Sequence, residues 1–351
     1  MTTITSHAAA TSTAAWRTRI TRLLGIRYPI LQAGMGDVAM APLAAAVSQA
    51  GALGVLGAIR LTPEQLDTEI RRVRELTDQP FGVDLVLPEP KAPSAAEMPE
   101  GVAYHAADPA MQRAMLDVVF GHRVPVLVCA MFLPEGAADE AHENGAKVLA
   151  MVGKVRHARR AERLGADAVI TSGYEAGGHT GTVAQGVLTR AVADQVEIPV
   201  IAGGGIVDGR GLAAAIMLGA DAVWMGTRFV ATAEATAHPR AKEAYLQLQE
   251  DDTVISRAVS GKTVRIARND FAREWEHREI KPFPEQAAII ARTGGAARSM
   301  REGEVQTAPL AVGQGVALVR DIPAVAELIP RILSEAAAAL AAAPDVLPPG
   351  S

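Results

Sequence analysis

"IPVIAGGGIVDGRGLAAAIMLGADAVWMG", residues 198–226, contains two short apolar runs on either side of one helical pattern. The runs IPVIAG (198–203) and DAVWMG (221–226) do not alternate with polar residues, which is typical of parallel strands buried on both faces. The segment between them, DGRGLAAAIMLGA (208–220), has a late glycine that suits a helix end. The stretch therefore predicts a strand–helix–strand unit.

Six further apolar runs precede this unit. They are YPILQA (28–33), ALGVLG (52–57), FGVDLV (81–86), VPVLVC (124–129), KVLAMV (147–152) and DAVITS (167–172). Helical patterns lie between them, such as TPEQLDTEIRRVRELTD (62–78), with Thr62 as N-cap, and VRHARRAERLGA (155–166). Eight alternating units predict an α/β fold of the TIM (β/α)8 barrel type. A doubly wound sheet is the alternative. The absence of a dinucleotide-binding fingerprint after the first strand argues against it.

The alternation stops after the eighth strand. Residues 236–305 contain an amphipathic helical stretch, HPRAKEAYLQLQ, and a charged segment, RNDFAREWEHREIKPFPEQ. We expect a smaller helical domain here, inserted beside the barrel mouth as a substrate-binding lid. The barrel domain would comprise 1–235 plus 306–351, with closing helices in GQGVALVRDIPAVAELIPRILSEAAAAL.

Composition excludes several classes of protein. The net charge is −5 with mixed signs, which argues against a nucleic-acid or anionic-membrane partner. No apolar stretch approaches the ~18–20 residues of a membrane span. The N-terminus MTTITSHAAATSTAAWRTR lacks a hydrophobic signal core, so we expect a disordered tail and a cytoplasmic protein. The sequence does not fix the oligomeric state, for which a homodimer is one option.

The chain has one cysteine, Cys129, which rules out an internal disulfide framework and fits a reducing cytosol. It follows the apolar run VPVLV, so we expect a small buried hydrophobic residue rather than a nucleophile.

Glycine-rich segments follow strands one, seven and eight, at the edge where TIM barrels place their active sites. IAGGGIVDGRG (201–211) and WMGTRF (224–229) put backbone N–H groups and helix N-termini where this fold commonly holds a phosphate. In QAGMG (32–36), Gly34 and Gly36 let a flat ring lie against the backbone, and Met35 can pack on it. A flat ring site after strand one and a phosphate site across the barrel mouth, after strands seven and eight, fit FMN, which carries both groups.

One histidine, His179, lies among the glycines of SGYEAGGHTG (172–181), seven residues past the sixth strand. It could be a general base, a metal ligand or a solvated loop residue. No His/Asp/Glu/Cys cluster has the spacing of metal ligands, so we predict no metal. Its position over the barrel mouth favours general acid–base catalysis, because histidine titrates near neutral pH and can take a proton from carbon.

Together these motifs resemble those of the FMN-dependent nitronate monooxygenases, formerly called 2-nitropropane dioxygenases. That family shares its fold with the FMN-type enoyl-acyl-carrier-protein reductases and related quinone reductases. The resemblance covers most of the chain, including RLLGIRYPILQAGMG, ERLGADAVITSGYEAGGHTG, IPVIAGGGIVDGRG, GADAVWMGTRFVAT and VGQG. These motifs are highly specific for the superfamily and much less specific for the reaction.

The resemblance implies roles for matching residues of this chain. His179 would be the catalytic base. The residues that would line or flank the flavin ring are Ala33, Gly34, Met35, Asp84, Val152, Gly178 and Gly181, with Gly313 and Gln314 closing over it. Asp84 among them would face the pyrimidine edge. The phosphate would be held by Gly203, Gly204, Gly205, Met225, Gly226 and Thr227.

Two departures from the family pattern stand out. The family usually has Asn where this chain has Asp84, which changes the hydrogen-bonding groups offered to the flavin. Many nitronate monooxygenases also carry a second histidine after strand four, in a motif like SFHFG, whereas this chain reads VLVCAMFLP. The GN-P pattern of the reductase and quinone-reductase branches is absent there too.

The resemblance implies FMN-dependent oxidation of a nitroalkane or its nitronate with O₂, giving an aldehyde or ketone plus nitrite. His179 would remove the acidic proton of a neutral nitroalkane. Met35, Phe132 and Met225 are candidates for an apolar mouth that favours small alkyl substrates. The alternative is an NAD(P)H-dependent reductase of enoyl thioesters or quinones. A non-catalytic flavin-binding protein would leave EAGGH unexplained.

Overall fold

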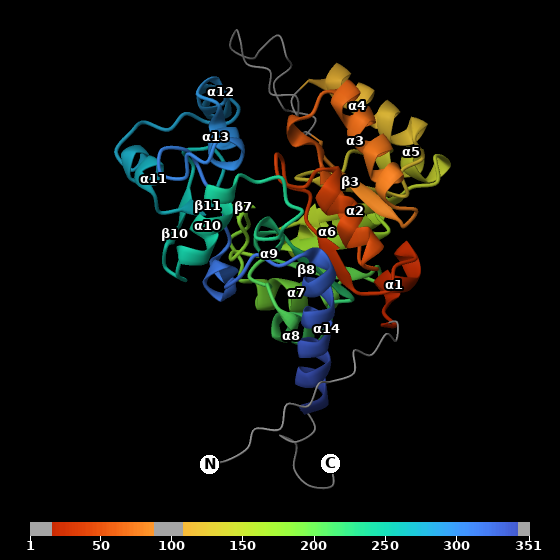
Figure 1. The fold of residues 1–351 in the computed structure, drawn as a ribbon. Coiled ribbons are helices and arrows are strands. Elements are labelled where there is room, and N and C mark those ends of the chain that lie inside the picture. Colours follow the sequence, from red (N-terminus) through yellow and green to blue (C-terminus); the bar gives the residue numbers. More distant parts are fainter. Residues whose placement is uncertain (1–15, 88–107, 343–351) are drawn as a thin grey trace, which may run out of the picture.

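The computed structural model describes residues 16–87 and 108–342, so residues 1–15 of the expected N-terminal tail lie outside the described residues. The end of that tail is structured, since the N–H of Trp16 donates to the carbonyl of Arg27 and Thr18 caps the first helix, which contradicts a disordered tail up to Arg19. One sheet contains eight parallel strands in the order β1-β9-β8-β6-β5-β4-β3-β2 (Figure 1). They are β1 (Ile30–Gln32), β2 (Gly54–Gly57), β3 (Phe81–Val86), β4 (Val126–Ala130), β5 (Lys147–Val152), β6 (Ala168–Ser172), β8 (Val200–Gly203) and β9 (Ala222–Met225). The eight expected strands are confirmed, with ends shifted by at most two residues.

The sheet closes between its two edge strands, β1 and β2. A parallel bridge joins Leu31 to Leu53, and the N–H of Gln32 donates to the carbonyl of Leu53 at 2.9 Å. The buried side-chain amide of Gln32 continues the pairing, because its Oε1 accepts the N–H of Val55 and its Nε2 donates to the carbonyl of Val55, each at 3.1 Å. Closure makes the fold a TIM-type barrel rather than a doubly wound sheet.

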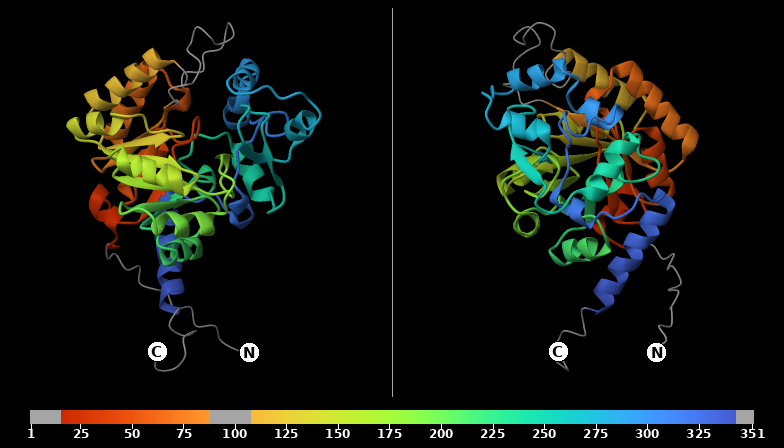
Figure 2. Two further views of the ribbon diagram at one scale, coloured as in Figure 1. Left: turned by 180° about the vertical axis from the view of Figure 1, so that it is seen from behind. Right: turned by 60° about the vertical axis from the view of Figure 1, so that its left-hand side comes forward.

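Helices cover the outside of the barrel (Figures 1 and 2). They are α2 (Ala41–Gln49), α3 (Pro63–Leu76), α4 (Pro109–Gly121), α5 (Ala137–Glu143), α6 (Val155–Arg163), α7 (Gln185–Ala193), α8 (Gly209–Met217) and α14 (Val325–Ala342). The helix expected over 62–78 is confirmed, and α3 begins at a capping box formed by Thr62 and Gln65. None of the helices in the described ranges is long and apolar enough to cross a membrane.

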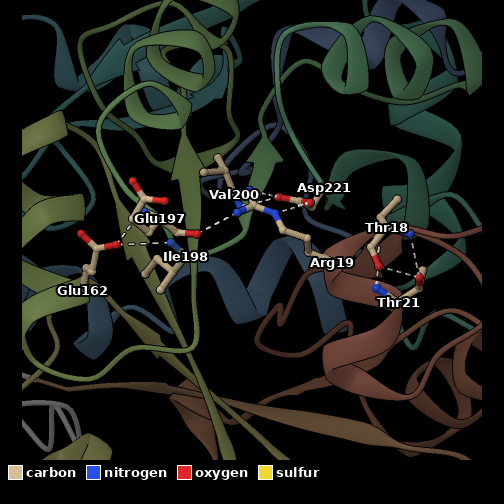
Figure 3. A network of polar contacts seen from close by, with 8 residues as sticks. All are labelled: Thr18, Arg19, Thr21, Glu162, Glu197, Ile198, Val200 and Asp221. Atoms are coloured by element: carbon tan, nitrogen blue, oxygen red, sulfur yellow. Dashed lines mark hydrogen bonds and ion pairs between the residues drawn. The ribbon is translucent and has the colours of Figure 1, made fainter.

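The N-terminal end of the barrel is plugged by α1 (Arg19–Leu24), whose Ile20 and Leu24 join the cluster of side chains inside the barrel. Arg19 donates to both carboxylate oxygens of Asp221 at 2.9 and 2.7 Å and to the carbonyl of Glu197 at 2.7 Å (Figure 3). In the same view the carboxylate of Glu162 accepts the N–H groups that precede β8. These contacts fix one end of the strands and leave the opposite edge for a site.

The segment after strand eight lies to one side of the barrel (Figures 1 and 2). It contains α10 (Pro239–Gln247), β10 (Thr253–Ser256), β11 (Val264–Ala267), α11 (Asp270–Trp275), α12 (Glu285–Arg292) and α13 (Gly295–Arg301). The prediction of a purely helical insertion is therefore incomplete. The two strands are hard to predict because each is short, and the charged Arg265 interrupts the apolar pattern of β11. They form an antiparallel sheet with β7 (Gly178–His179), which follows strand β6 of the barrel.

Candidate active site

Residues far apart in the sequence meet at the carboxyl edge of the barrel strands. A methyl group added to Gly34, after β1, would lie 2.3 Å from Cβ of Asp84 on β3. One added to Gly226, after β9, would lie 3.5 Å from Sδ of Met35 and 3.6 Å from Cβ of Ala33. The predicted bed for the flavin ring is therefore a continuous surface of backbone and small side chains.

The predicted phosphate loop follows β8. Gly204 and Gly205 have φ values of +110° and +73°, in the left-handed region that glycine adopts without strain. They line a cavity of about 360 Å³ together with Gln314 and Gly315 from the C-terminal segment. The loop thus borders open space, as a site for a phosphate-bearing ligand requires.

Helix N-termini at this edge differ in what they can offer an anion. Asp208 caps α8, since its carboxylate accepts the N–H of Gly211 at 2.8 Å, so an acidic group already occupies that helix end. At α9 (Thr227–Val230) the Thr227 hydroxyl oxygen accepts the N–H of Gly313 at 3.0 Å, which leaves the hydroxyl proton to donate to a ligand. The phosphate contacts would come from the glycine loop and Thr227.

Two of the expected mouth residues contribute differently. The side chain of Met225 is fully buried in the cluster between the barrel and its outer helices, so its prediction as a mouth residue is wrong. The alternation of the strand points Trp224 inward and Met225 outward, and only the backbone of Met225 faces this edge, where its carbonyl accepts the N–H of Ala33 at 2.9 Å.

Phe132 is half-buried, with the Arg160 guanidinium over its ring at 4.4 Å. Val152 ends β5, and a methyl group added to Gly181 would lie 3.6 Å from Cα of the following residue, Gly153.

Asp84 is a buried carboxyl against the flavin bed. Its Oδ1 has no hydrogen-bond partner in the described part of the chain, and burial raises the pKa of Asp84 to about 8. The group is therefore neutral at pH 7, when one oxygen can accept a hydrogen bond and the other can donate one. An asparagine amide offers the same pair of groups. A neutral Asp84 thus fits the N–H and carbonyl of a flavin pyrimidine edge.

His179 is held by the inserted segment. Its strand β7 pairs with β11, with His179 opposite Val264 and Gly178 opposite Arg265. Nε2 of His179 lies 2.9 Å from Oγ of Ser260. Burial, and to a smaller extent the charge of Lys262, lowers the pKa of His179 to about 4. The imidazole is therefore neutral at pH 7.

A buried arginine secures the loop that carries His179. The Arg265 guanidinium donates to the carbonyl of Tyr174 at 3.2 and 2.9 Å and to the hydroxyl of Thr253 at 2.7 Å. It also lies over the ring of Tyr174, 4.6 Å from the centroid. Because Arg265 is on β11, the loop after β6 and the inserted segment behave as one unit.

A second connection joins the inserted segment to the barrel. Asp37, buried after β1, lies 2.8 Å from Nε of Arg60 and 2.5 Å from Nη2 of Arg301 on α13. The sequence motifs do not predict this contact. They also do not predict that Ser260, Lys262 and Arg265 lie near the histidine loop, because these contacts join segments far apart in the sequence. No local sequence signal places Arg265 beside the histidine loop, because all four residues of β11 are buried and its pairing with β7 is long-range.

The thiol of Cys129 is fully buried on β4, which confirms the prediction of a small hydrophobic residue. Burial, with a smaller effect of Asp84, raises the pKa of this thiol. In the described ranges no group of three or more His, Cys, Asp or Glu residues could hold a metal ion.

Comparison with known proteins places this barrel, with its glycine-rich loops at the carboxyl edge of the strands, among oxidoreductases. The family model described as nitronate monooxygenase matches residues 17–335, so the chain belongs to the nitronate monooxygenase family. Membership in this family implies a flavin cofactor.

Three similar proteins differ in their named reactions. The chain is 32% identical to (3aS,4S,5R,7aS)-5-hydroxy-7a-methyl-1-oxo-octahydro-1H-indene-4-carboxyl-CoA dehydrogenase of Rhodococcus jostii, over 91% of this chain and 96% of that protein. FabK from Thermotoga maritima has 38% identity and a TM-score of 0.83, covering 95% of this chain and 100% of that one. A nitroalkane oxidase from Streptomyces ansochromogenes has 32% identity and a TM-score of 0.83, covering 92% and 99%.

The raised pKa of Asp84 predicts a pH-dependent cost to folding. A carboxyl with a pKa of about 8 in the folded chain and 3.8 in the unfolded chain stabilises the fold below pH 4 and loses that contribution as pH rises to 8. Asp84→Asn should therefore gain stability relative to wild type by about 2–5 kcal/mol between pH 5 and pH 9. Urea denaturation of flavin-free protein measures this difference. The exposed Asp78→Asn is the control, and parallel wild-type and Asp84→Asn curves would contradict the assignment.

Gly226→Ala tests the predicted cofactor site, in which the resemblance assigns Gly226 to the phosphate. Gly226 has φ −101°, which alanine adopts, and the new methyl would make ordinary contacts with Met35 and Ala33. It should leave the stability of the flavin-free protein within about 1 kcal/mol but weaken FMN binding about 10- to 100-fold, because the methyl would take space that the bound cofactor needs. Fluorescence titration of flavin-free protein with FMN measures this. Gly186→Ala on α7 is the matched control, and equal affinities of the two variants would place the cofactor site elsewhere.

Proposed function

We propose that this protein oxidises alkyl nitronates and neutral nitroalkanes with FMN and O₂, yielding an aldehyde or ketone and nitrite. The observation that carries this proposal is the neutral imidazole of His179, which lies in the loop after barrel strand β6 and is held there by the inserted segment. The family model and the similarity to a nitroalkane oxidase support it.

In this proposal the barrel binds the cofactor. Gly203, Gly204, Gly205 and Thr227 would hold the FMN phosphate, while Gly34, Met35 and Asp84 would lie against the ring. Bound FMN supplies an acceptor for the substrate's electrons and passes them to O₂. Asp84, being neutral, would hold the pyrimidine edge without placing a negative charge beside it.

His179 would act on the substrate proton. A neutral nitroalkane must lose the hydrogen next to its nitro group, and an imidazole that is neutral at pH 7 can accept it. The pKa of about 4 makes this a weak base, but one that is already in its accepting form at physiological pH. The half-buried side chains of Met35 and Phe132 would bound the alkyl part of the substrate.

A second candidate function is NAD(P)H-dependent, FMN-mediated reduction of the double bond of an enoyl thioester, or of a quinone. FabK at 38% identity and a carboxyl-CoA dehydrogenase at 32% identity favour it. In that reaction His179 would orient the thioester or the nicotinamide rather than take a proton from a nitroalkane.

Anaerobic reduction of the flavin distinguishes the two candidates. The oxidised holoprotein is mixed with propyl nitronate, or separately with NADH and NADPH, and the flavin absorbance is followed. We expect rapid bleaching by nitronate alone, and release of FMN rather than FAD on heating. Bleaching by a nicotinamide alone would support the thioester reaction instead.

Replacing the histidine tests its role as base. His179→Asn should retain the fold and the flavin, because Asn is polar and tolerated in glycine-rich loops. Turnover of neutral nitroalkane should fall roughly 10²–10⁴-fold, the usual contribution of a positioned general base. A pre-formed nitronate has already lost its proton and should be affected much less. Steady-state kinetics on both substrates decide the matter, since equal losses would mean that His179 only orients the substrate.

A further inference from the structure

Ser260 lies in the turn between β10 and β11, and its side chain is buried. Its Oγ is 2.9 Å from Nε2 of His179, although the two residues are 81 positions apart in the sequence. The N–H of Lys262 also points at this oxygen, at 3.4 Å. A hydroxyl oxygen has two lone pairs, so it can accept one hydrogen bond from Lys262 and one from the imidazole.

The turn that carries Ser260 is built to hold its place. The Arg257 carbonyl accepts the N–H of Gly261, and the Arg257 side chain donates to the carbonyl of Gly261, each at 2.8 Å. Gly261 packs against the backbone around Phe283, where a methyl group would lie 2.4 Å from the Phe283 nitrogen. Buried Gln286 donates to the carbonyl of Ala258 at 2.6 Å. Ser260 is thus a fixed partner for His179 rather than a mobile surface residue.

This contact distinguishes the two ring nitrogens. Nε2 is engaged by Ser260, so Nδ1 is the ring nitrogen that this contact leaves for a substrate. When Nε2 carries the hydrogen and donates it to Ser260, Nδ1 has a free lone pair, which is what a general base needs.

We propose that Ser260 is a positioning residue, which accepts a hydrogen bond from Nε2 of His179 and thereby selects the tautomer whose Nδ1 takes the proton of the substrate. The expected effect of Ser260 on turnover rests on the proposed function. The expected tautomer of His179 does not depend on it. A hydroxyl orients the ring without the negative charge of a carboxylate, so the imidazole stays neutral until it accepts the proton.

The tautomer can be observed directly. Two-bond ¹H–¹⁵N correlation spectra of ¹⁵N-histidine-labelled holoprotein at pH 7 report it, and His179→Asn identifies the signals. We expect wild type to show hydrogen on Nε2, and Ser260→Ala to show a mixture of tautomers. Ser260→Thr should restore the wild-type pattern because it retains the hydroxyl. Ser256→Ala, which removes a hydroxyl that accepts the N–H of Ala258, is the matched control and should change nothing. Hydrogen on Nδ1 in wild type, or an unchanged tautomer in Ser260→Ala, would overturn the proposal.

Kinetics separate positioning from a purely structural role. In Ser260→Ala, kcat/KM for neutral nitroalkane should fall roughly 10- to 100-fold, as for other residues that orient a reactive group, while turnover of nitronate stays near wild type. An equal loss on both substrates would mean that Ser260 only supports the fold. If wild type turns over neither substrate, the proposed function fails, and the spectra still decide the tautomer.

Discussion

The side-chain amide of Gln32 is the contact on which the arrangement of the site depends. It pairs with both backbone groups of Val55 and so completes the junction between the first and second strands. Without it, those buried groups would each lack a partner, at a cost of about 1–3 kcal/mol per group. Closure brings the ends of all eight strands around one mouth. Gly34 after β1 can therefore face Asp84 on β3, and Gly226 after β9 can face Met35.

The molecule divides the work of the site between two parts. Under the proposed function the barrel would provide the flavin bed and the phosphate loop, from backbone and small side chains. The inserted segment holds His179 in position. It does so through the β7–β11 pairing, the contact of Ser260 with the imidazole, and the hydrogen bonds of Arg265 to the histidine loop. The contacts of Asp37 with Arg60 and Arg301 tie the two parts together a second time. Under the proposed function the barrel would bind the cofactor and the inserted segment would contact the substrate, so changes in the inserted segment could alter the reaction while the cofactor site is kept. That division is consistent with the different reactions named for similar proteins.

The barrel could be predicted from sequence because its information is local. Each buried strand is a short apolar run, and some helix starts are marked by capping residues such as Thr62 and Asp208. The arrangement of the site was harder to predict from sequence. The outward direction of Met225 depends on strand register, and the contact of Ser260 with His179 depends on antiparallel pairing between segments 81 residues apart. The position of Asp84 could be inferred from its motif, but its protonation depends on burial, which only the packed structure reveals.

Two ionisable groups at the mouth have pKa values shifted in opposite directions for one reason. Burial raises the pKa of Asp84 to about 8 and lowers that of His179 to about 4, so both are neutral between those values. An ionised Asp84 would repel negative charge that a flavin ring gains when it accepts electrons. A protonated His179 could not take a proton from carbon. The proposed oxidation of a neutral nitroalkane needs a cofactor site without a negative charge and an unprotonated imidazole nitrogen, and burial of Asp84 and His179 meets both needs.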